Sequence, residues 1–158
     1  MAGFTHAGVF VLRMGIVGGG PGAFIAPVHR AAAEPDGAIR LVAGAFSSNP
    51  ARSKVAGRTY GIADDRTYSS YEEMLRVESK RADRIDFVSI VTPNHFPVAV
   101  AALERGFHVI SDKPATATLE EACKLRDVVK RTGKFYALTH TYKGYPLVRE
   151  ARTQSSRT

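Results

Sequence analysis

The fold is decided by Val17–Phe24, which read VGGGPGAF and come directly after an apolar run. Four of these eight residues are glycine, the residue that loses the most conformational freedom on folding. Such a loop behind a first strand fits three structures: a plain tight turn, the loop of a methyltransferase, or a cradle for the phosphates of a dinucleotide. Features elsewhere in the chain discriminate among them.

Apolar strands and amphipathic helices alternate along the chain. We expect strands at 9–17, 39–46, 85–91, 107–111 and 135–139, and helices at 24–33, 50–56, 70–80, 97–105 and 118–131. Almost continuously apolar strands separated by helices are typical of a parallel sheet covered on both faces. We therefore predict an α/β fold, a Rossmann-like doubly wound domain with a mainly parallel sheet.

This domain is expected to occupy residues 9–152. Residues 1–8 are interpreted as a leader, and residues 153–158 as a disordered tail because they are polar and without periodicity. The segment 57–68 is expected to be irregular, with a brief strand near Thr59–Tyr60.

Composition excludes several classes of protein. The chain has 158 residues, 44% of them hydrophobic and 23% charged, which is typical of a globular domain and not of a disordered chain. No apolar run is long enough to span a bilayer, so no membrane partner is predicted. The net charge of +7 is spread over many segments, and we predict no nucleic-acid partner and no metal site. The single cysteine, Cys123, fits a cytoplasmic protein and is expected to be buried in a helix.

The glycine loop has the residues that a dinucleotide cradle requires. Gly18-x-Gly20-x-x-Ala23 matches the glycine fingerprint in its variant ending in alanine. Gly18 would allow the tight turn, Gly20 would let the backbone approach a pyrophosphate, and Ala23 would let helix and strand pack closely. The helix that begins near Gly22 and Phe24 would point its free N–H groups at the phosphates.

The loop after the second expected strand bears on the choice of cofactor. NAD-binding proteins usually carry an acidic residue there, which accepts hydrogen bonds from the adenosine ribose. This chain has Ser47 and Ser48 instead, followed by Arg52. Hydroxyls with a nearby arginine suit a 2′-phosphate, so the sequence slightly favours NADP and leaves NAD open. The missing acid also argues against a methyltransferase.

Two further strand ends carry more specific motifs. Ile90–His95 read IVTPNH, and His108–Pro114 read HVISDKP. Together with the glycine loop and Gly144–Pro146, they resemble the Gfo/Idh/MocA family over roughly residues 12–152. The resemblance implies an NAD(P)-dependent oxidoreductase that transfers a hydride to or from a secondary alcohol or ketone of a sugar or polyol.

The resemblance also implies roles for individual residues. Lys113 matches the lysine that lies beside the nicotinamide and the reacting hydroxyl, where it would handle a proton. Asp112 stands where the family usually has Glu, and it would orient Lys113 or contact the cofactor. Thr92, Pro93 and Asn94 match the turn that lines the cofactor site.

Three other residues are candidates for the same edge of the sheet. His95 is expected to line the nicotinamide side of the cofactor together with Thr92, Pro93 and Asn94. It follows Asn94 at once, whereas the family commonly has a histidine about three residues further on, so the loop here is about two residues shorter. His140 and Tyr142 follow the last expected strand and are candidates to face the substrate.

The family has a second domain, of antiparallel sheet and helices, that carries the substrate pocket. It follows the region that matches Gly144–Pro146, and 158 residues leave no room for it. We therefore expect this chain to be the nucleotide-binding part of such an enzyme, as a fragment or a truncated product. The alternatives are a dinucleotide-binding module without catalysis and, third, a methyltransferase-like domain. A homo-oligomer is left open.

Overall fold

The computed structural model describes residues 11–155. Its centre is a sheet of five strands in the order β2-β1-β3-β4-β5, in which every neighbouring pair is parallel. The strands are β1 (Leu12–Val17), β2 (Ile39–Ala45), β3 (Phe87–Ile90), β4 (His108–Ser111) and β5 (Tyr136–Leu138). Because the strand order reverses between β2-β1 and β1-β3, the carboxyl ends of these strands form a switch point of the kind at which α/β proteins bind ligands.

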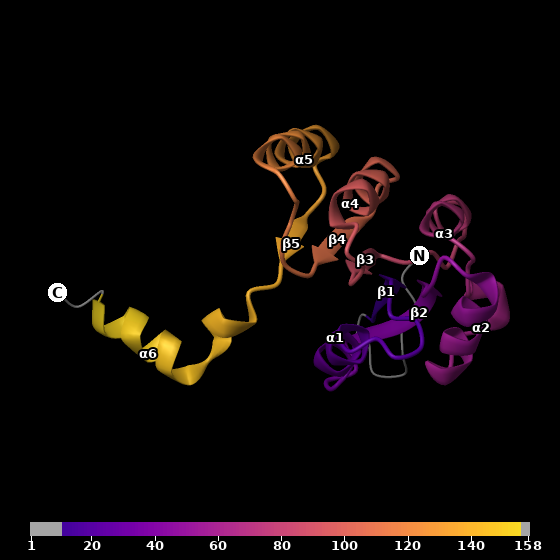
Figure 1. Ribbon diagram of the computed structural model, residues 1–158, viewed down its shortest axis with the longest axis horizontal. Coiled ribbons are helices and arrows are strands. Elements are labelled where there is room, and N and C mark those ends of the chain that lie inside the picture. Colours follow the sequence, from indigo (N-terminus) through magenta and orange to yellow (C-terminus); the bar gives the residue numbers. More distant parts are fainter. Residues whose placement is uncertain (1–10, 156–158) are drawn as a thin grey trace.

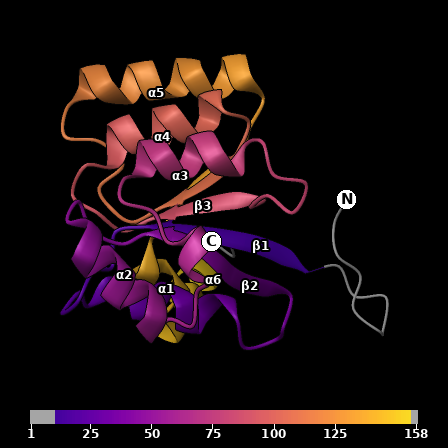
Figure 2. The same ribbon diagram turned by 90° about the vertical axis from the view of Figure 1, so that its right-hand side faces the viewer.

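Helices cover both faces of the sheet. Figure 2 shows α3, α4 and α5 above the sheet and α1 and α2 below it, which confirms the predicted doubly wound fold. The α-helices are α1 (Ile25–Ala33), α2 (Pro50–Thr59), α3 (Tyr71–Glu78), α4 (His95–Glu104), α5 (Leu119–Thr132) and α6 (Pro146–Ser155). Two 3₁₀ turns, η1 (Asp64–Arg66) and η2 (Thr141–Gly144), complete the described chain. In Figure 1, α6 extends away from the sheet, and none of its residues is buried.

Local sequence signals set the starts of three helices. The side chains of Asn49, Ser70 and Thr118 each accept a hydrogen bond from the backbone N–H three residues later. Each bond satisfies an N–H group that has no partner within its helix, and such a cap is worth about 1 kcal/mol. Gly133, in the left-handed conformation, ends α5.

The core lies in two clusters, one on each face of the sheet. The larger cluster joins the sheet to α3, α4 and α5 and includes Leu75, Val88 and Leu103. The smaller cluster lies under β1 and β2 and includes Ile16 and Phe46. All four residues of β3 are buried, as expected for a central parallel strand.

A buried ion pair joins α3 to the chain around η1. The Glu78 carboxylate is completely buried and accepts hydrogen bonds from Arg66 Nε at 3.0 Å and Nη2 at 2.6 Å. It also accepts bonds from the Tyr68 hydroxyl at 2.8 Å and the Ile85 backbone N–H at 3.1 Å. Burial, and then the bond to Glu78, raises the pKa of Tyr68 well above its ordinary range. These contacts tie residues 66–68 to α3 and to the chain that leads into β3.

The structure corrects the expectation for 57–68. The residues at 57–59 belong to α2, so the brief strand near Thr59–Tyr60 is wrong, and the 3₁₀ turn η1 follows. Gly57 explains the error, because glycine usually weakens a helix interior. Here a Cβ at Gly57 would lie 2.3 Å from Thr67 Oγ1, so the glycine lets α2 pack against the following loop.

Other boundaries also differ from the predictions. α4 begins at His95, two residues earlier than expected, because Pro97 is tolerated in the first turn of a helix. α6 continues through Ser155, so 153–155 are helical and not a disordered tail; 156–158 lie outside the described residues. The expected leader, and the first two residues of the strand predicted at 9–17, also lie outside them. Cys123 is exposed on α5 and not buried.

Candidate cofactor-binding site

The glycine loop follows β1 at the switch point and needs glycine for two separate reasons. The first reason is backbone conformation, because Gly18, Gly19 and Gly22 have φ of 100°, 90° and 86°. The second is close approach. A Cβ at Gly18 would lie 2.9 Å from the carbonyl carbon of Val91, and one at Gly20 would lie 3.0 Å from a backbone oxygen of the loop after β2. Side chains at Gly18 and Gly20 would meet the protein's own backbone, so these two glycines let the loop pack closely against the chain after β2 and β3.

Gly19 is a residue that the sequence reasoning missed. A Cβ at Gly19 would lie only 2.4 Å from the Cβ of Ala26 on α1. The close contact between loop and helix that was assigned to Ala23 therefore occurs at Gly19. Ala23 instead closes the turn with its N–H, which donates to the Gly20 carbonyl at 2.9 Å. The signal for Gly19 was its place in an unbroken run of three glycines.

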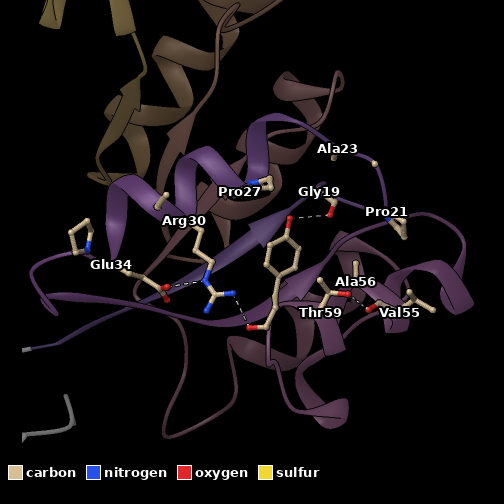
Figure 3. Close-up of a pocket in the computed structure, with 14 residues that line it drawn as sticks. Gly19, Pro21, Ala23, Pro27, Arg30, Glu34, Val55, Ala56 and Thr59 are labelled. Atoms are coloured by element: carbon tan, nitrogen blue, oxygen red, sulfur yellow. Dashed lines mark hydrogen bonds and ion pairs between the residues drawn. The ribbon is translucent and has the colours of Figure 1, made fainter.

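Tyr60, the residue that follows α2, contacts the glycine loop at Gly19. The Tyr60 hydroxyl donates to the Gly19 carbonyl at 3.4 Å, and its ring stacks on Phe46 with centroids 5.1 Å apart. The Arg30 guanidinium lies 5.7 Å from the Tyr60 ring centre and donates to the Tyr60 carbonyl and to Glu34. Figure 3 shows the dashed line between Arg30 and Glu34. An open groove of about 680 Å³ between α1 and α2 is lined by Gly19, Arg30, Glu34 and Tyr60 among others. The loop therefore rests on a packed aromatic support.

The start of α1 has no side-chain cap. Phe24 is the residue before the helix, its side chain makes no capping bond, and it is 82% exposed. The first N–H groups of α1 are therefore free of a competing side-chain acceptor, and they carry the partial positive charge of a helix start.

A second cavity, of about 360 Å³, lies at the carboxyl ends of β1, β2 and β3. Its walls bring together five of the predicted cofactor residues: Gly18, Ser47, Ser48, Thr92 and Asn94. These residues come from three separate loops, so the fold alone places them side by side.

The same cavity is lined by two residues that the sequence reasoning did not assign to it, Tyr71 and Glu72 at the start of α3. Burial works to raise the pKa of Glu72, but hydrogen bonds from its own backbone, Tyr71 and Ser70 lower the pKa below its ordinary value. Glu72 is therefore a carboxylate in this wall. Its only sequence signal was a capping box, which indicates a helix start and no ligand.

Arg52 connects α2 to the glycine loop. Its Nη2 donates to the Pro21 carbonyl at 3.3 Å. Ser47 is held at the other side of this junction, where its hydroxyl accepts from the Asn49 backbone N–H at 3.2 Å. Arg52 therefore reaches from α2 to the glycine loop, and the two serines lie on the loop that joins β2 to α2.

Asp112 and Lys113 follow β4 directly. The Asp112 carboxylate accepts a hydrogen bond from Thr139 Oγ1 at 2.8 Å. Burial works to raise the pKa of Asp112, but the Thr139 bond and the nearby charges of His29 and Lys113 lower it below its ordinary value. Lys113 is exposed, and its bond to Pro114 is cis. A charged carboxylate and an exposed ammonium thus stand next to each other at this strand end.

The remaining predicted residues lie in different places. Pro93 and His95 line a smaller cleft of about 120 Å³, together with Asn94, Pro114 and others. His95 itself is largely buried, and its Nδ1 lies 2.9 Å from Ser111 Oγ. His140 and Tyr142 are exposed on the segment that leads to α6 and do not line the 360 Å³ cavity.

We expect acid to destabilise this fold well above the range of carboxylate titration. Three histidines have a pKa below the ordinary value of 6.5, and burial is the largest cause of the lowering in each: His29, His95 and His108. For a histidine with a lowered folded pKa, the unfolded chain binds protons first, so its stabilising contribution is present above pH 6.5 and lost as pH falls through the folded value. Urea unfolding between about pH 8 and pH 5 checks the sign. Stability that stays level or rises toward pH 5 would contradict it.

Residues 11–155 contain neither a metal-binding cluster nor a membrane-spanning helix. No cluster of three or more His, Cys, Asp or Glu side chains there is placed to hold a metal ion. Within the same residues, no helix has both the length and the apolar character that crossing a membrane requires.

The fold and the glycine loop together define a Rossmann-type nucleotide-binding domain. The sequence pattern of GFO_IDH_MocA, described as an oxidoreductase family with an NAD-binding Rossmann fold, matches residues 12–140. The chain belongs to this family of oxidoreductases.

Individual relatives agree with this assignment. The chain is 37% identical over 144 residues to the uncharacterized oxidoreductase YfiI of Bacillus subtilis, covering 89% of this chain and 37% of YfiI. The crystal structure of an oxidoreductase from Sinorhizobium meliloti is 46% identical, with a TM-score of 0.86, over 93% of this chain and 41% of that chain.

An inositol dehydrogenase homologue from Azotobacter vinelandii, solved with NAD⁺ and also with NADH and myo-inositol, is 38% identical with a TM-score of 0.89. It covers 93% of this chain, and this chain spans 38% or 39% of it. The chain therefore spans about two fifths of the length of the relatives it matches.

Proposed function

We propose that this chain is the NAD(P)-binding part of an oxidoreductase that transfers a hydride to or from a secondary alcohol or ketone of a sugar or polyol. The observation that carries the proposal is the place of the glycine loop, which lies at the switch point of a parallel sheet and leads into a helix start without a side-chain cap. The complex of the Azotobacter vinelandii homologue with NADH and myo-inositol supports the substrate class.

The chain's own residues suit the parts of such a cofactor. Backbone N–H groups of Gly20 and Gly22 would hold the pyrophosphate beside the uncapped start of α1, with Ala23 closing the turn between them and the helix. Ser47 and Ser48 would bind the adenosine ribose.

At the other end of the cofactor, Thr92, Pro93 and Asn94 would line the nicotinamide side. The cofactor supplies the electron pair that moves as hydride. Lys113 would hold or move the proton of the reacting hydroxyl at its Nζ, and Asp112 would orient Lys113 or contact the cofactor.

We further propose that Arg52 favours NADP by binding the 2′-phosphate. Arg52→Ala should raise the Kd of NADPH about tenfold and leave the Kd of NADH within about twofold, because a hydrogen bond to a charged group is worth about 1.5–3 kcal/mol. Arg58→Ala is the matched control, since Arg58 lies on the same helix and pairs with Asp64. An equal loss for both cofactors in Arg52→Ala would contradict the proposed role.

Nicotinamide absorbance tests the reaction itself. The chain is mixed with NADPH or NADH and a panel of ketones derived from sugars and polyols, and oxidation of the cofactor is followed. Turnover that Lys113→Ala abolishes, with cofactor Kd within a few-fold and with Lys124→Ala as an unaffected control, supports the proposal. Turnover that survives in Lys113→Ala contradicts the role of this lysine.

The residues that would hold the cofactor also suit a second function, which requires cofactor binding alone. A dinucleotide-binding module without catalysis would bind NADPH or NADH in the same assay and oxidise neither with any ketone. That result would replace the oxidoreductase proposal for this chain with the module.

A further inference from the structure

His95 is buried at the first residue of α4, beside the last residue of β4. It is 8% exposed, and its Nδ1 lies 2.9 Å from the hydroxyl oxygen of Ser111, which is completely buried. The Ser111 hydroxyl also lies 3.0 Å from the backbone carbonyl of Asp112 and donates to it. A continuous chain of contacts thus runs from α4 through β4 to the peptide group that joins Asp112 to Lys113.

Counting protons determines the tautomer of His95. A serine hydroxyl has one proton and two lone pairs, and a carbonyl can only accept. When Ser111 donates to Asp112, both contacts are hydrogen bonds only if His95 Nδ1 carries a proton and donates to Ser111. If Ser111 donated to His95 instead, the Asp112 carbonyl would lose its bond. The first arrangement makes two bonds and the second makes one, so the Nδ1–H tautomer is favoured.

The environment of Ser111 fits this arrangement. The Tyr136 hydroxyl is buried and interacts with Ser111, which works to lower the pKa of Tyr136 against the larger effect of burial. Because a serine oxygen has two lone pairs, Ser111 can accept from both Tyr136 and His95 while it donates to Asp112. Burial, with an opposing effect of Asp112 and a smaller contribution from Lys113, lowers the pKa of His95 below its ordinary value. The ring is therefore neutral at neutral pH, which a defined tautomer requires.

The residue before Lys113 is anchored from three neighbouring elements. The Asp112 N–H donates to the Ile90 carbonyl on β3 at 2.9 Å, and its carboxylate accepts from Thr139 beyond β5. The Thr139 N–H in turn donates to the Ser111 carbonyl at 2.9 Å. The Asp112 carbonyl is the remaining polar group of this residue, and His95 controls it through Ser111.

We propose that His95 is a positioning residue that orients the Asp112–Lys113 peptide through Ser111, and that it is not a cofactor contact. The lysine that it positions is catalytic only if the proposed function holds, so the inference rests on that function for its consequence. The orientation itself is a property of the chain without cofactor.

The test uses NMR on the intact chain without cofactor. Two-bond ¹H–¹⁵N correlations of the imidazole should show a protonated Nδ1 and an unprotonated Nε2 for His95 above pH 7. In Ser111→Ala this preference should be lost, because the acceptor is gone. The opposite tautomer in the native chain would overturn the proposal.

Hydrogen exchange then measures how firmly the backbone around Asp112 is held. His95→Leu and Ser111→Ala should each speed exchange of the Asp112 and Thr139 amides about fivefold, the factor that corresponds to one hydrogen bond of about 1 kcal/mol. Amides of Gly18 and Val91, bonded to Ala45 and Val17 at the same edge, should be unchanged.

A rescue variant distinguishes a positioning role of the His95 hydrogen bond from a role of its ring in packing. Asparagine carries an amide donor near the place of Nδ1, so His95→Asn should restore the Asp112 and Thr139 amides to within twofold of native. His108→Leu, which changes a histidine at the opposite end of β4, is the matched control and should leave them unaltered. Exchange that speeds equally in His95→Asn and His95→Leu, or in neither, overturns the proposal.

Cofactor titration of the same variants distinguishes a failure of the proposed function from a failure of the positioning role of His95. If neither NADPH nor NADH binds the native chain, the proposed function fails while the tautomer and exchange results still decide the role of His95. If a cofactor binds, His95→Leu should leave its Kd within a few-fold. A Kd raised more than about a hundredfold, the loss of a strong direct contact, would overturn the statement that His95 is not a cofactor contact.

Discussion

Replacing Gly19 with alanine is expected to lower the free energy of unfolding by about 3 kcal/mol and to abolish dinucleotide binding. The backbone at Gly19 has φ of 90°, which costs a residue with a Cβ about 1–3 kcal/mol. The new methyl group would also lie 2.4 Å from the Cβ of Ala26, which is completely buried. Loop and α1 would have to separate, and this distorts the N–H groups proposed to hold the pyrophosphate.

Gly37→Ala is the matched control for this substitution. Gly37 has φ of 73°, and no atom lies within 4 Å of the position of its Cβ, so alanine there meets backbone strain without a clash. Urea unfolding of the two variants isolates the contact with Ala26, and Gly19→Ala with Ala26→Gly should recover part of the loss. Equal destabilisation by Gly19→Ala and Gly37→Ala would contradict the close contact between loop and helix.

The second large loss of stability is expected when the buried carboxylate of Glu78 is removed. Glu78→Leu should destabilise the protein by about 3–5 kcal/mol, because it leaves the guanidinium of Arg66 buried without its main partner. Arg66 is 8% exposed, and its remaining acidic partner, Asp83, is half-exposed. The substitution also removes the acceptor of the Tyr68 hydroxyl and the Ile85 N–H.

The double variant Arg66→Met with Glu78→Leu tests the cause. Removing both charges should recover most of the loss, since a buried ion pair replaced by apolar residues is often neutral. Asp83→Asn, which weakens only the exposed side of the network, should cost less than about 1 kcal/mol. Denaturant unfolding measures all three, and a double variant as unstable as Glu78→Leu would contradict the account.

The sequence allowed prediction of features that depend on residues near one another in the chain. The cap at Asn49 and the capping boxes at Ser70 and Thr118 involve a side chain and a backbone N–H three residues away, so spacing alone reveals them. The parallel sheet was predictable for a similar reason, because buried strands such as β3 appear as short continuous apolar runs.

Features that depend on distant partners were missed. Gly57 suggested the end of a helix, because its contact with Thr67 exists only once the loop has folded back. Arg66 and Glu78 each look like ordinary surface charges until α3 and η1 meet. Nothing in the spacing of Tyr60 indicates that its hydroxyl supports Gly19.

The candidate site also contains residues that could be predicted from the sequence and residues that could not. The loops that carry Gly18, Ser47 and Thr92 were identified from their places after strands, because parallel strands bring their carboxyl ends to one edge. Glu72 was missed because a helix start gives no sign of which cavity it faces. His95 was found as a motif residue, but its bond to Ser111 depends on how closely α4 packs on β4.

The central claim, that this chain binds a nicotinamide dinucleotide at the glycine loop, is tested most directly by calorimetric titration. NADPH, NADH and S-adenosylmethionine are titrated in turn into the native chain and into Gly19→Ala. We expect saturable binding of a nicotinamide cofactor to the native chain, none to Gly19→Ala, and no binding of S-adenosylmethionine. Binding of S-adenosylmethionine alone, or of none of the three to a folded native chain, would contradict it.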